Sequence, residues 1–366
     1  MLPGLLLASL LIVGPGLPIL SVQVLPTAPL TLSELLRQGR QLVAQQQFAA
    51  ALEVYQEAAR LQPQDSSIFS AIGYLQAQLN NRPAALEAYR RAIQLNPRNP
   101  DFHNALGSLL GSEGRYADAA AAYRQSLRLQ PRQTTAVLGL ATVQARQGLF
   151  TPATTTLQQA LRSQPRNREL QEALARLWIQ AGRPGEALTL LTQLTRETPT
   201  NATLRRLIGI AWAAQGNLPQ AQAALNEAIR LAPQDGEAWM QLGQILEASG
   251  DLEGAINAYG STARLSPEQT VRAYSAIGRL ARARGDWPAA ITAYQEVVQA
   301  EPNGPDARFF LGEALGKVNR VPEALPELEA ARQLYAQQGD TAGMARADAL
   351  LQQLKPLAPK RAKPRR

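Results

Sequence analysis

The chain of 366 residues contains no cysteine and a single histidine, His103. The lack of cysteine excludes disulfides, thiolate metal sites and cysteine nucleophiles. The sequence also lacks a phosphate-binding glycine loop, a paired-histidine metal motif and a nucleophile elbow. We therefore predict no catalytic residues, no metal and no cofactor, which means that the protein is not expected to be an enzyme. His103 is predicted to be a packing residue.

Aromatic residues are also scarce, at 5% of the chain, although hydrophobic residues reach 45%. Alanine and leucine, both strong helix formers, therefore supply much of the apolar content. Long alternating runs of β-branched residues, which would indicate strands, are missing. The composition predicts an all-α protein.

Charged side chains are missing from residues 1–33, where an apolar run from Leu5 to Val13 ends at Gly14 and Pro15. Its length suits the core of a signal peptide better than a membrane span. No basic residue precedes it and no clear cleavage site follows. Three interpretations of this segment are considered: an export signal or anchor, a segment that touches a membrane, and a misassigned start of the chain. We expect an exported or membrane-associated protein, with a cytoplasmic one as the alternative.

The net charge of +8 is concentrated at the other end of the chain. The last twelve residues, from Lys355 to Arg366, contain six basic residues and no acidic one. Without these six, 31 basic residues face 29 acidic ones, so the rest of the chain is nearly neutral. The basic isoelectric point is therefore weak support for nucleic-acid binding by the folded part. The tail itself is predicted to be disordered and able to contact an anionic membrane.

A repeat of 34 residues dominates the sequence. Prolines recur at this spacing at Pro63, Pro97, Pro131, Pro165, Pro199, Pro233 and Pro267, and then at Pro302. Twelve residues before each proline is an alanine, and a ninth alanine continues the series: Ala51, Ala85, Ala119, Ala153, Ala187, Ala221, Ala255, Ala290 and Ala324. A glycine usually lies twelve residues before the alanine, and a tyrosine or leucine lies four after it. A small residue at both positions allows two helices to cross closely, and the large residue fills the space between repeats.

The third repeat reads DFHNALGSLLGSEGRYADAAAAYRQSLRLQP from Asp101, and its pattern resembles the tetratricopeptide repeat (TPR) family. The resemblance covers about nine repeats from Leu32 to Gln338, each a helix, a turn and a second helix. It implies a right-handed superhelical solenoid. The predicted organisation is an apolar segment at 1–31, nine repeats at 32–338, a capping helix at 339–354 and a basic tail at 355–366. In the third repeat we expect helices near Pro100–Glu113 and Tyr116–Leu129.

The resemblance also implies a concave groove lined by the second, fifth and ninth residues of each first helix. The predicted partner-binding residues at these positions are Arg40, Tyr74, Asn104, Glu169, Glu172, Arg176, Arg206, Glu237, Gln244, Arg272, Arg279 and Phe309. The positions in the first half are small and polar, whereas those in the second half carry charges of both signs. Mixed charge favours recognition through specific pairs.

We therefore predict a scaffold or adaptor that binds proteins or peptide segments in this groove. A role in assembling a membrane-associated or exported complex is part of that hypothesis. The alternative is an RNA-binding helical-repeat protein. Nucleic acid is the less favoured partner because the folded part is nearly neutral and its groove has few aromatic residues.

Overall fold

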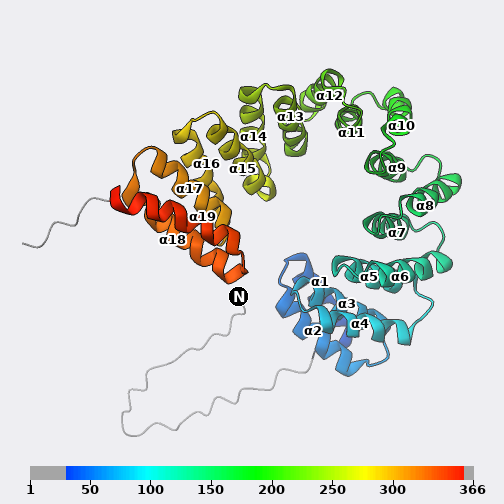
Figure 1. Cartoon of the computed structure of the whole chain (residues 1–366). Coiled ribbons are helices and arrows are strands. Elements are labelled where there is room, and N and C mark those ends of the chain that lie inside the picture. The colour runs from blue at the N-terminus through cyan, green and yellow to red at the C-terminus, as the bar shows by residue number, and fades with distance from the viewer. Residues whose placement is uncertain (1–29, 358–366) are drawn as a thin grey trace, which may run out of the picture. The chain divides into compact units, whose positions relative to one another are not determined.

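The computed structural model describes residues 30–357. This part of the chain consists of 19 α-helices and two short 3-10 helices, without any β-strand (Figure 1). The chain divides into two compact units, residues 1–98 and residues 99–366, and each is described by itself.

The first unit contains the first two repeats. Its helices are α1 (Leu32–Ala44), α2 (Phe48–Leu61), α3 (Ser66–Gln78) and α4 (Arg82–Leu95). The Thr31 side chain accepts from the Glu34 amide, and the Glu34 carboxylate accepts from the Thr31 amide at 2.8 Å. This capping box satisfies amide groups that the first turn leaves unpaired. The hydrogen bonds from Thr31 also hold the pKa of Glu34 below its ordinary value.

The second unit contains the other seven repeats. Their helices are α5 (Pro100–Ser112), α6 (Tyr116–Leu129), α7 (Thr134–Arg146), α8 (Phe150–Ser163), α9 (Arg168–Gln180), α10 (Pro184–Glu197), α11 (Ala202–Ala214), α12 (Leu218–Leu231), α13 (Gly236–Ser249), α14 (Leu252–Leu265), α15 (Thr270–Ala283), α16 (Trp287–Ala300), α17 (Pro305–Lys317) and α18 (Val321–Gln338). A 3-10 turn at Pro267–Gln269 precedes α15. The helices predicted for the third repeat are confirmed, with α5 one residue shorter than expected.

Each first helix ends at a residue with left-handed backbone. Glycines such as Gly114 (φ 76°) and Gly250 (φ 87°) take this role in six repeats, as their positions in the sequence predict. In the other three repeats Gln46, Asn80 and Asn319 adopt φ values of 58–61°. The chain then turns directly into the second helix.

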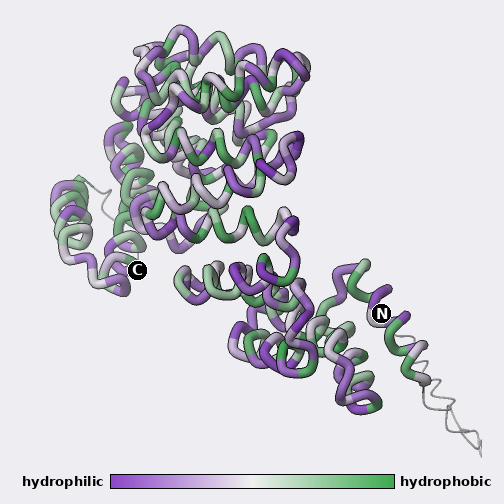
Figure 2. Tube along the Cα trace, turned by 90° about the vertical axis from the view of Figure 1, so that its right-hand side faces the viewer, coloured by the Kyte–Doolittle hydropathy of each residue, from purple (hydrophilic) through white to green (hydrophobic). Residues whose placement is uncertain are grey.

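Within each unit the core is formed by contacts between paired helices and between neighbouring repeats. All nine alanines of the repeat series, from Ala51 to Ala324, are 0% exposed. Hydrophobic and hydrophilic residues alternate along the helices (Figure 2), so each helix buries one side against its neighbours. This arrangement confirms the predicted all-α solenoid of about nine repeats.

A final helix, α19 (Thr341–Leu354), covers the end of the ninth repeat. Ala347, Leu351 and Leu354 are buried in the same cluster as residues of α17 and α18. The predicted capping helix therefore forms at the expected place. The first residues of the predicted tail continue it as a 3-10 turn, Lys355–Leu357, in which the Lys355 ammonium lies 3.6 Å from Glu329. The predictions for the segment 1–29 and for the tail residues 358–366 lie outside the described residues.

Candidate partner-binding groove

The inner side of the second unit is formed by its first helices. In Figure 1, α7, α9, α11, α13 and α15 lie on the inside of the arc that this unit traces, and their partner helices lie outside. The second, fifth and ninth residues of a helix are three to four apart and lie on one face. The predicted groove residues of this unit therefore belong to a common side of successive helices.

In the first unit, Arg40 on α1 and Tyr74 on α3 are both exposed. The Tyr74 ring is 41% exposed and meets the Phe48 ring edge to face, with 6.3 Å between centroids. A large exposed aromatic ring of this kind can pack against a ligand.

Several predicted groove residues bond to the neighbouring repeat. The Asn104 side chain donates to Thr135 across 3.4 Å, and Arg206 forms a half-buried ion pair with Asp235 at 3.0 Å. The carboxylate of Glu237 accepts from Gln269 at 2.7 Å. These side chains hold successive first helices together, a role that the groove prediction did not include. The two residues of each pair are 29 to 32 positions apart in the sequence, close to one repeat length. This spacing is the signal in the sequence that could have indicated contacts between repeats.

Arg279 belongs to a similar network. Its guanidinium lies 2.7 Å from Glu247, whose carboxylate also accepts from the Tyr259 hydroxyl at 2.9 Å. The bond from Arg279 is the main reason that the pKa of Glu247 lies below its ordinary value. Burial, followed by the bond to Glu247, raises the pKa of Tyr259. Arg279 is nevertheless half exposed, with 53% of its side chain accessible.

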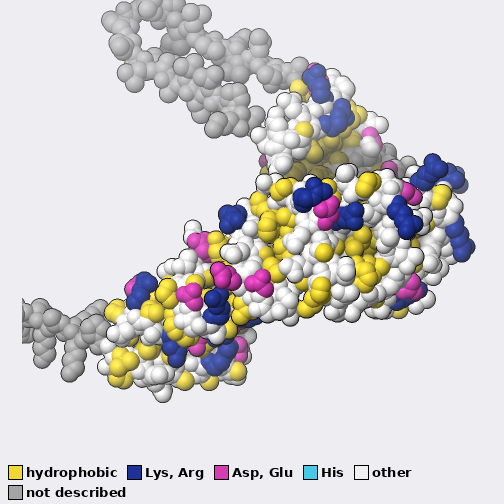
Figure 3. Space-filling model, turned by 90° about the horizontal axis from the view of Figure 1, so that it is seen from above, with side chains coloured by type: hydrophobic (Ala, Val, Ile, Leu, Met, Phe, Trp, Pro, Cys, Tyr) yellow, Lys and Arg dark blue, Asp and Glu magenta, His cyan; other side chains and the backbone are white. Residues whose placement is uncertain are grey.

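The remaining polar groove residues are more accessible. Glu169, Arg176, Gln244 and Arg272 are exposed, and only Arg176 has an ion pair, a long one of 3.9 Å to Glu172. Acidic and basic side chains are also interspersed over the face drawn in Figure 3. These exposed residues are the ones that can exchange water for a ligand at low cost.

Phe309 does not present a free ring to the groove. It is 8% exposed, because Arg346 of the capping helix lies over it at 5.2 Å from the ring centroid. Its neighbour Phe310 packs against it edge to face. The sequence placed Phe309 at a groove position, but the capping helix covers that position in the last repeat.

One pocket, of about 690 Å³, lies between α7, α8 and α9. Its apolar walls come from residues of all three helices, including Leu138, Leu157 and Leu177. Arg146 and Arg176 add basic groups, and Glu169 adds an acidic one. The volume is within the range of about 300–1,000 Å³ that is common for ligand sites.

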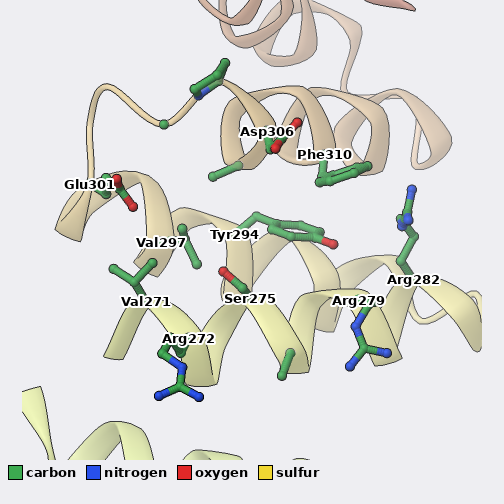
Figure 4. Close-up of a pocket in the computed structure, with 14 residues that line it drawn as sticks. Val271, Arg272, Ser275, Arg279, Arg282, Tyr294, Val297, Glu301, Asp306 and Phe310 are labelled. Atoms are coloured by element: carbon green, nitrogen blue, oxygen red, sulfur yellow. The ribbon is translucent and has the colours of Figure 1, made fainter. Parts of the chain in front are cut away.

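A second pocket, of about 660 Å³, lies between α15, α16 and α17. Arg272 and Arg279 come from α15, and Asp306 and Phe310 come from the facing helix α17 (Figure 4). The ring of Phe310 stacks on Tyr294 of α16 with 5.5 Å between centroids. Both pockets are thus lined by residues at predicted groove positions.

The other candidate residues have packing roles. His103 is 8% exposed within α5. Trp178, Trp212, Trp239 and Trp287 pack against the hydrophobic clusters as predicted. Residues 30–357 contain no group of three or more His, Cys, Asp or Glu side chains that could hold a metal ion. Within the same residues, no helix combines the length and the apolar character needed to cross a membrane.

Paired antiparallel helices that stack with a regular period and expose one helix of each pair on an inner face define a helical-repeat solenoid. A family model described as tetratricopeptide repeat matches residues 36–100, 70–134, 206–270 and 275–339, and a second model with the same description matches residues 112–177. These matches cover more than half of the chain. The chain belongs to the tetratricopeptide repeat family, whose repeats typically mediate protein–protein interactions.

Solved structures share the fold at low sequence identity. A tetratricopeptide repeat protein from Parabacteroides merdae is 17% identical, with a TM-score of 0.57 over 64% of this chain and 93% of that one. The human IFIT1 dimer with m7Gppp-AAAA is 15% identical, with a TM-score of 0.55 over 90% of this chain and 91% of that one. Among the curated proteins compared with the chain, none matches its sequence.

Proposed function

We propose that the protein is a non-catalytic scaffold or adaptor that binds a segment of a partner protein along the inner face of the second unit. The observation that carries this proposal is the composition of the two pockets. The second, fifth and ninth residues of first helices, counted in α15 from Val271, contribute to their walls, among them Thr142, Glu169, Arg272 and Ser275. A ligand bound at the pockets would therefore contact the face by which we expect the family to recognise peptides.

Protein is favoured over RNA as the partner because of how the groove charges are arranged. Arg206 and Arg279 are each paired with a carboxylate of the adjacent repeat. Paired arginines do not form the continuous positive surface that binding to a phosphate backbone requires. The bound RNA of human IFIT1 belongs to a protein that shares the fold at 15% identity, and it carries no argument for this chain.

The partner complex is proposed to be exported or membrane-associated. The support for this is the uncharged, apolar sequence of residues 1–33 together with the basic residues that end the sequence. Fractionation of cells that produce the tagged full chain would test the proposal. Recovery in the membrane or exported fraction is expected, and recovery only in the cytoplasmic fraction would contradict it.

The groove proposal is tested by reversing exposed charges on the two faces of the second unit. Peptides are first selected from a displayed library of random 12-residue sequences with the full chain as bait. The groove variant combines Arg176→Glu with Arg272→Glu. The matched control combines Arg162→Glu with Arg196→Glu, two exposed arginines of the second helices α8 and α10.

We expect the groove variant to weaken binding of the selected peptides at least tenfold, because like charges across an interface are unfavourable. The control should bind as the original chain does. Circular dichroism verifies that both variants keep their helicity. A groove variant that binds normally, or a control that is equally impaired, would place binding outside the groove and overturn the proposal.

A further inference from the structure

The pocket between α7, α8 and α9 has its origin in the packing between repeats. In each repeat a large residue of the second helix, here called the spacer residue, lies between the first helices of its own repeat and of the next. Tyr123 is an example: its ring fills the space beside Gly107 of α5 and Gly139 of α7, where an added Cβ at either glycine would press on the ring. Ser108, the ninth residue of α5, follows Gly107 at a groove position.

The sixth residue of the next first helix, counted in α15 from Val271, is here called the facing residue, and in most layers it compensates for the size of the spacer residue. Large spacers face small residues, and small spacers face large ones. The pairs in the second unit that follow this rule are Tyr123 with Gly139, Tyr259 with Ala276, Leu191 with Leu207 and Leu225 with Gln241. Tyr294 with Phe310 departs from it, because both residues are large and their rings stack. In the four layers that follow the rule, a larger residue on one side is matched by a smaller one on the other, as a close-packed interior requires.

The fourth repeat departs from the rule in the opposite sense to Tyr294 and Phe310. Its spacer residue is Leu157, and the facing residue is Ala173. Both are small for their positions, and both line the pocket, as does Ala141 at the position of Gly107. Thr142, which corresponds to Ser108, lines it as well. The pocket therefore occupies the space that a tyrosine ring fills in other repeats, and it opens toward the groove face.

Charged groups lie at the two ends of this pocket. Glu169 is in the first turn of α9, whereas Arg176 and the last residue of α7, Arg146, lie toward the other end. All three side chains are exposed, and neither Glu169 nor Arg146 forms an ion pair with another residue of the described range 30–357. Seven residues of helix separate Glu169 from Arg176, which corresponds to about 10 Å. An extended peptide covers that distance in about three residues.

We propose that this pocket binds one bulky apolar side chain, leucine or an aromatic residue, of an extended partner segment. An acidic residue of the same segment lies against Arg146 and Arg176. A basic residue about three positions away lies against Glu169. The apolar side chain takes the place that a tyrosine of the protein itself takes in other repeats. This inference deepens the proposed function and rests on it.

The first test fills the pocket with residues that the chain already uses elsewhere. Ala141→Gly with Leu157→Tyr restores the glycine–tyrosine combination of the third repeat. Ala173→Leu instead reproduces the leucine–leucine combination of Leu191 and Leu207. This single variant provides a second way to fill the pocket if the double variant does not fold. Ala141→Gly alone is the matched control, because it leaves the pocket open.

The probes are synthetic peptides taken from the 12-residue library selected with the full chain. We expect enriched sequences with an apolar residue between an acidic and a basic one. Their affinity, measured by titration, should fall at least tenfold with either filled variant and stay within twofold with Ala141→Gly. Filled variants that bind these peptides normally would overturn the proposal, and so would a selection that yields no such sequence.

The second test exchanges charges between the pocket and the peptide. Arg146→Glu should weaken a selected peptide, and replacing the acidic residue of that peptide by lysine should restore binding to this variant. A lack of restoration contradicts the assigned contact. Loss of binding in the Arg176→Glu, Arg272→Glu variant together with normal binding in the filled variants would retain the groove function and reject only the pocket assignment.

Discussion

At the scale of single residues, the size of a side chain determines which positions of the repeat it can occupy. The alanines of the repeat series are 0% exposed because two helices cross at their Cβ atoms. At one of these crossings, the backbone carbonyl oxygen of Ala221 lies only 3.2 Å from the position that a Cβ atom on Gly209 would occupy. Larger side chains have no room at such a crossing.

Ala221→Leu should destabilise the protein by about 1–3 kcal/mol, because overpacking a tight contact forces side chains and backbone to shift. Ala223→Leu is the control, since Ala223 lies on the same helix, α12, and is exposed. Its unfolding free energy should change by less than about 0.5 kcal/mol. Urea denaturation followed by circular dichroism measures both. Equal effects would mean that the repeat register is assigned wrongly.

The ends of the first helices show how far residue patterns reach. Glycine predicts the left-handed turn at Gly114 and its five equivalents, because glycine adopts positive φ without steric cost. Asn80 and Asn319 are compatible with the same geometry. Gln46 has no such preference, and its φ of 58° follows from the surrounding turn, in which the Gln47 amide donates to Leu42 at 2.9 Å. The repeat period, more than the residue itself, indicates this turn.

At the scale of elements, polar side chains connect one repeat to the next. Arg279 reaches back from α15 to Glu247 on α13, and Arg282 of α15 reaches forward to Glu313 on α17 at 2.9 Å. Such pairs set the spacing of successive first helices on the groove side. Because they are only partly buried, each contributes modestly to stability.

Glu247→Gln should alter how stability depends on pH. The folded state holds the pKa of Glu247 below its ordinary value of 4.5, chiefly through the hydrogen bond from Arg279. The carboxylate therefore stabilises the protein above the unfolded pKa, and this contribution is lost as pH falls through the folded pKa. At pH 7 the variant should be less stable by about 0.5–1 kcal/mol.

The difference between the variant and the original protein should shrink as pH falls below about 4.5. Glu253→Gln is the control, since Glu253 on α14 is exposed and forms no ion pair with any residue that the structure describes. Thermal unfolding at a series of pH values measures the effect. A difference that stays constant from pH 7 to pH 3 would show that the charge of Glu247 has no part in it.

The sequence predicted elements better than it predicted contacts. The bounds of α6 agree with the predicted ones, and α19 ends where predicted but begins two residues later, because proline, glycine and alanine mark the ends and crossings of the helices. The partners of Arg206 and Arg279 could not be predicted, because the same groove positions also suit a ligand. Similarly, the burial of Phe309 depends on Arg346, a residue of the capping helix that the repeat pattern does not describe.

At the scale of the whole molecule, each repeat contacts mainly its neighbours, so the terminal repeats need a cover. The capping helix α19 provides it for the ninth repeat through Leu351 and Leu354, which are 4% and 5% exposed. Five further basic residues follow in the sequence at 358–366. Their composition indicates an electrostatic role.

Removal of residues 358–366 should reduce binding to anionic vesicles without changing the melting temperature. These residues include Lys360, Arg361, Lys363, Arg365 and Arg366, and the truncation leaves the Lys355–Leu357 turn in place. A basic residue near an anionic surface contributes about 1 kcal/mol, so loss of all five should reduce partitioning at least about 100-fold. Salt should weaken binding of the full chain, since the attraction is screened within about 10 Å at 0.1 M.

The control keeps the length of the tail and replaces the same five residues by glutamine. Cosedimentation with vesicles that contain phosphatidylserine should then show the same loss as truncation, because charge alone is removed. Vesicles of neutral lipid should not bind the full chain, the truncated chain or the glutamine variant through the tail. If the glutamine variant bound anionic vesicles as well as the full chain, contact with the membrane would have to arise elsewhere, and the apolar residues 1–33 would be the next segment to delete.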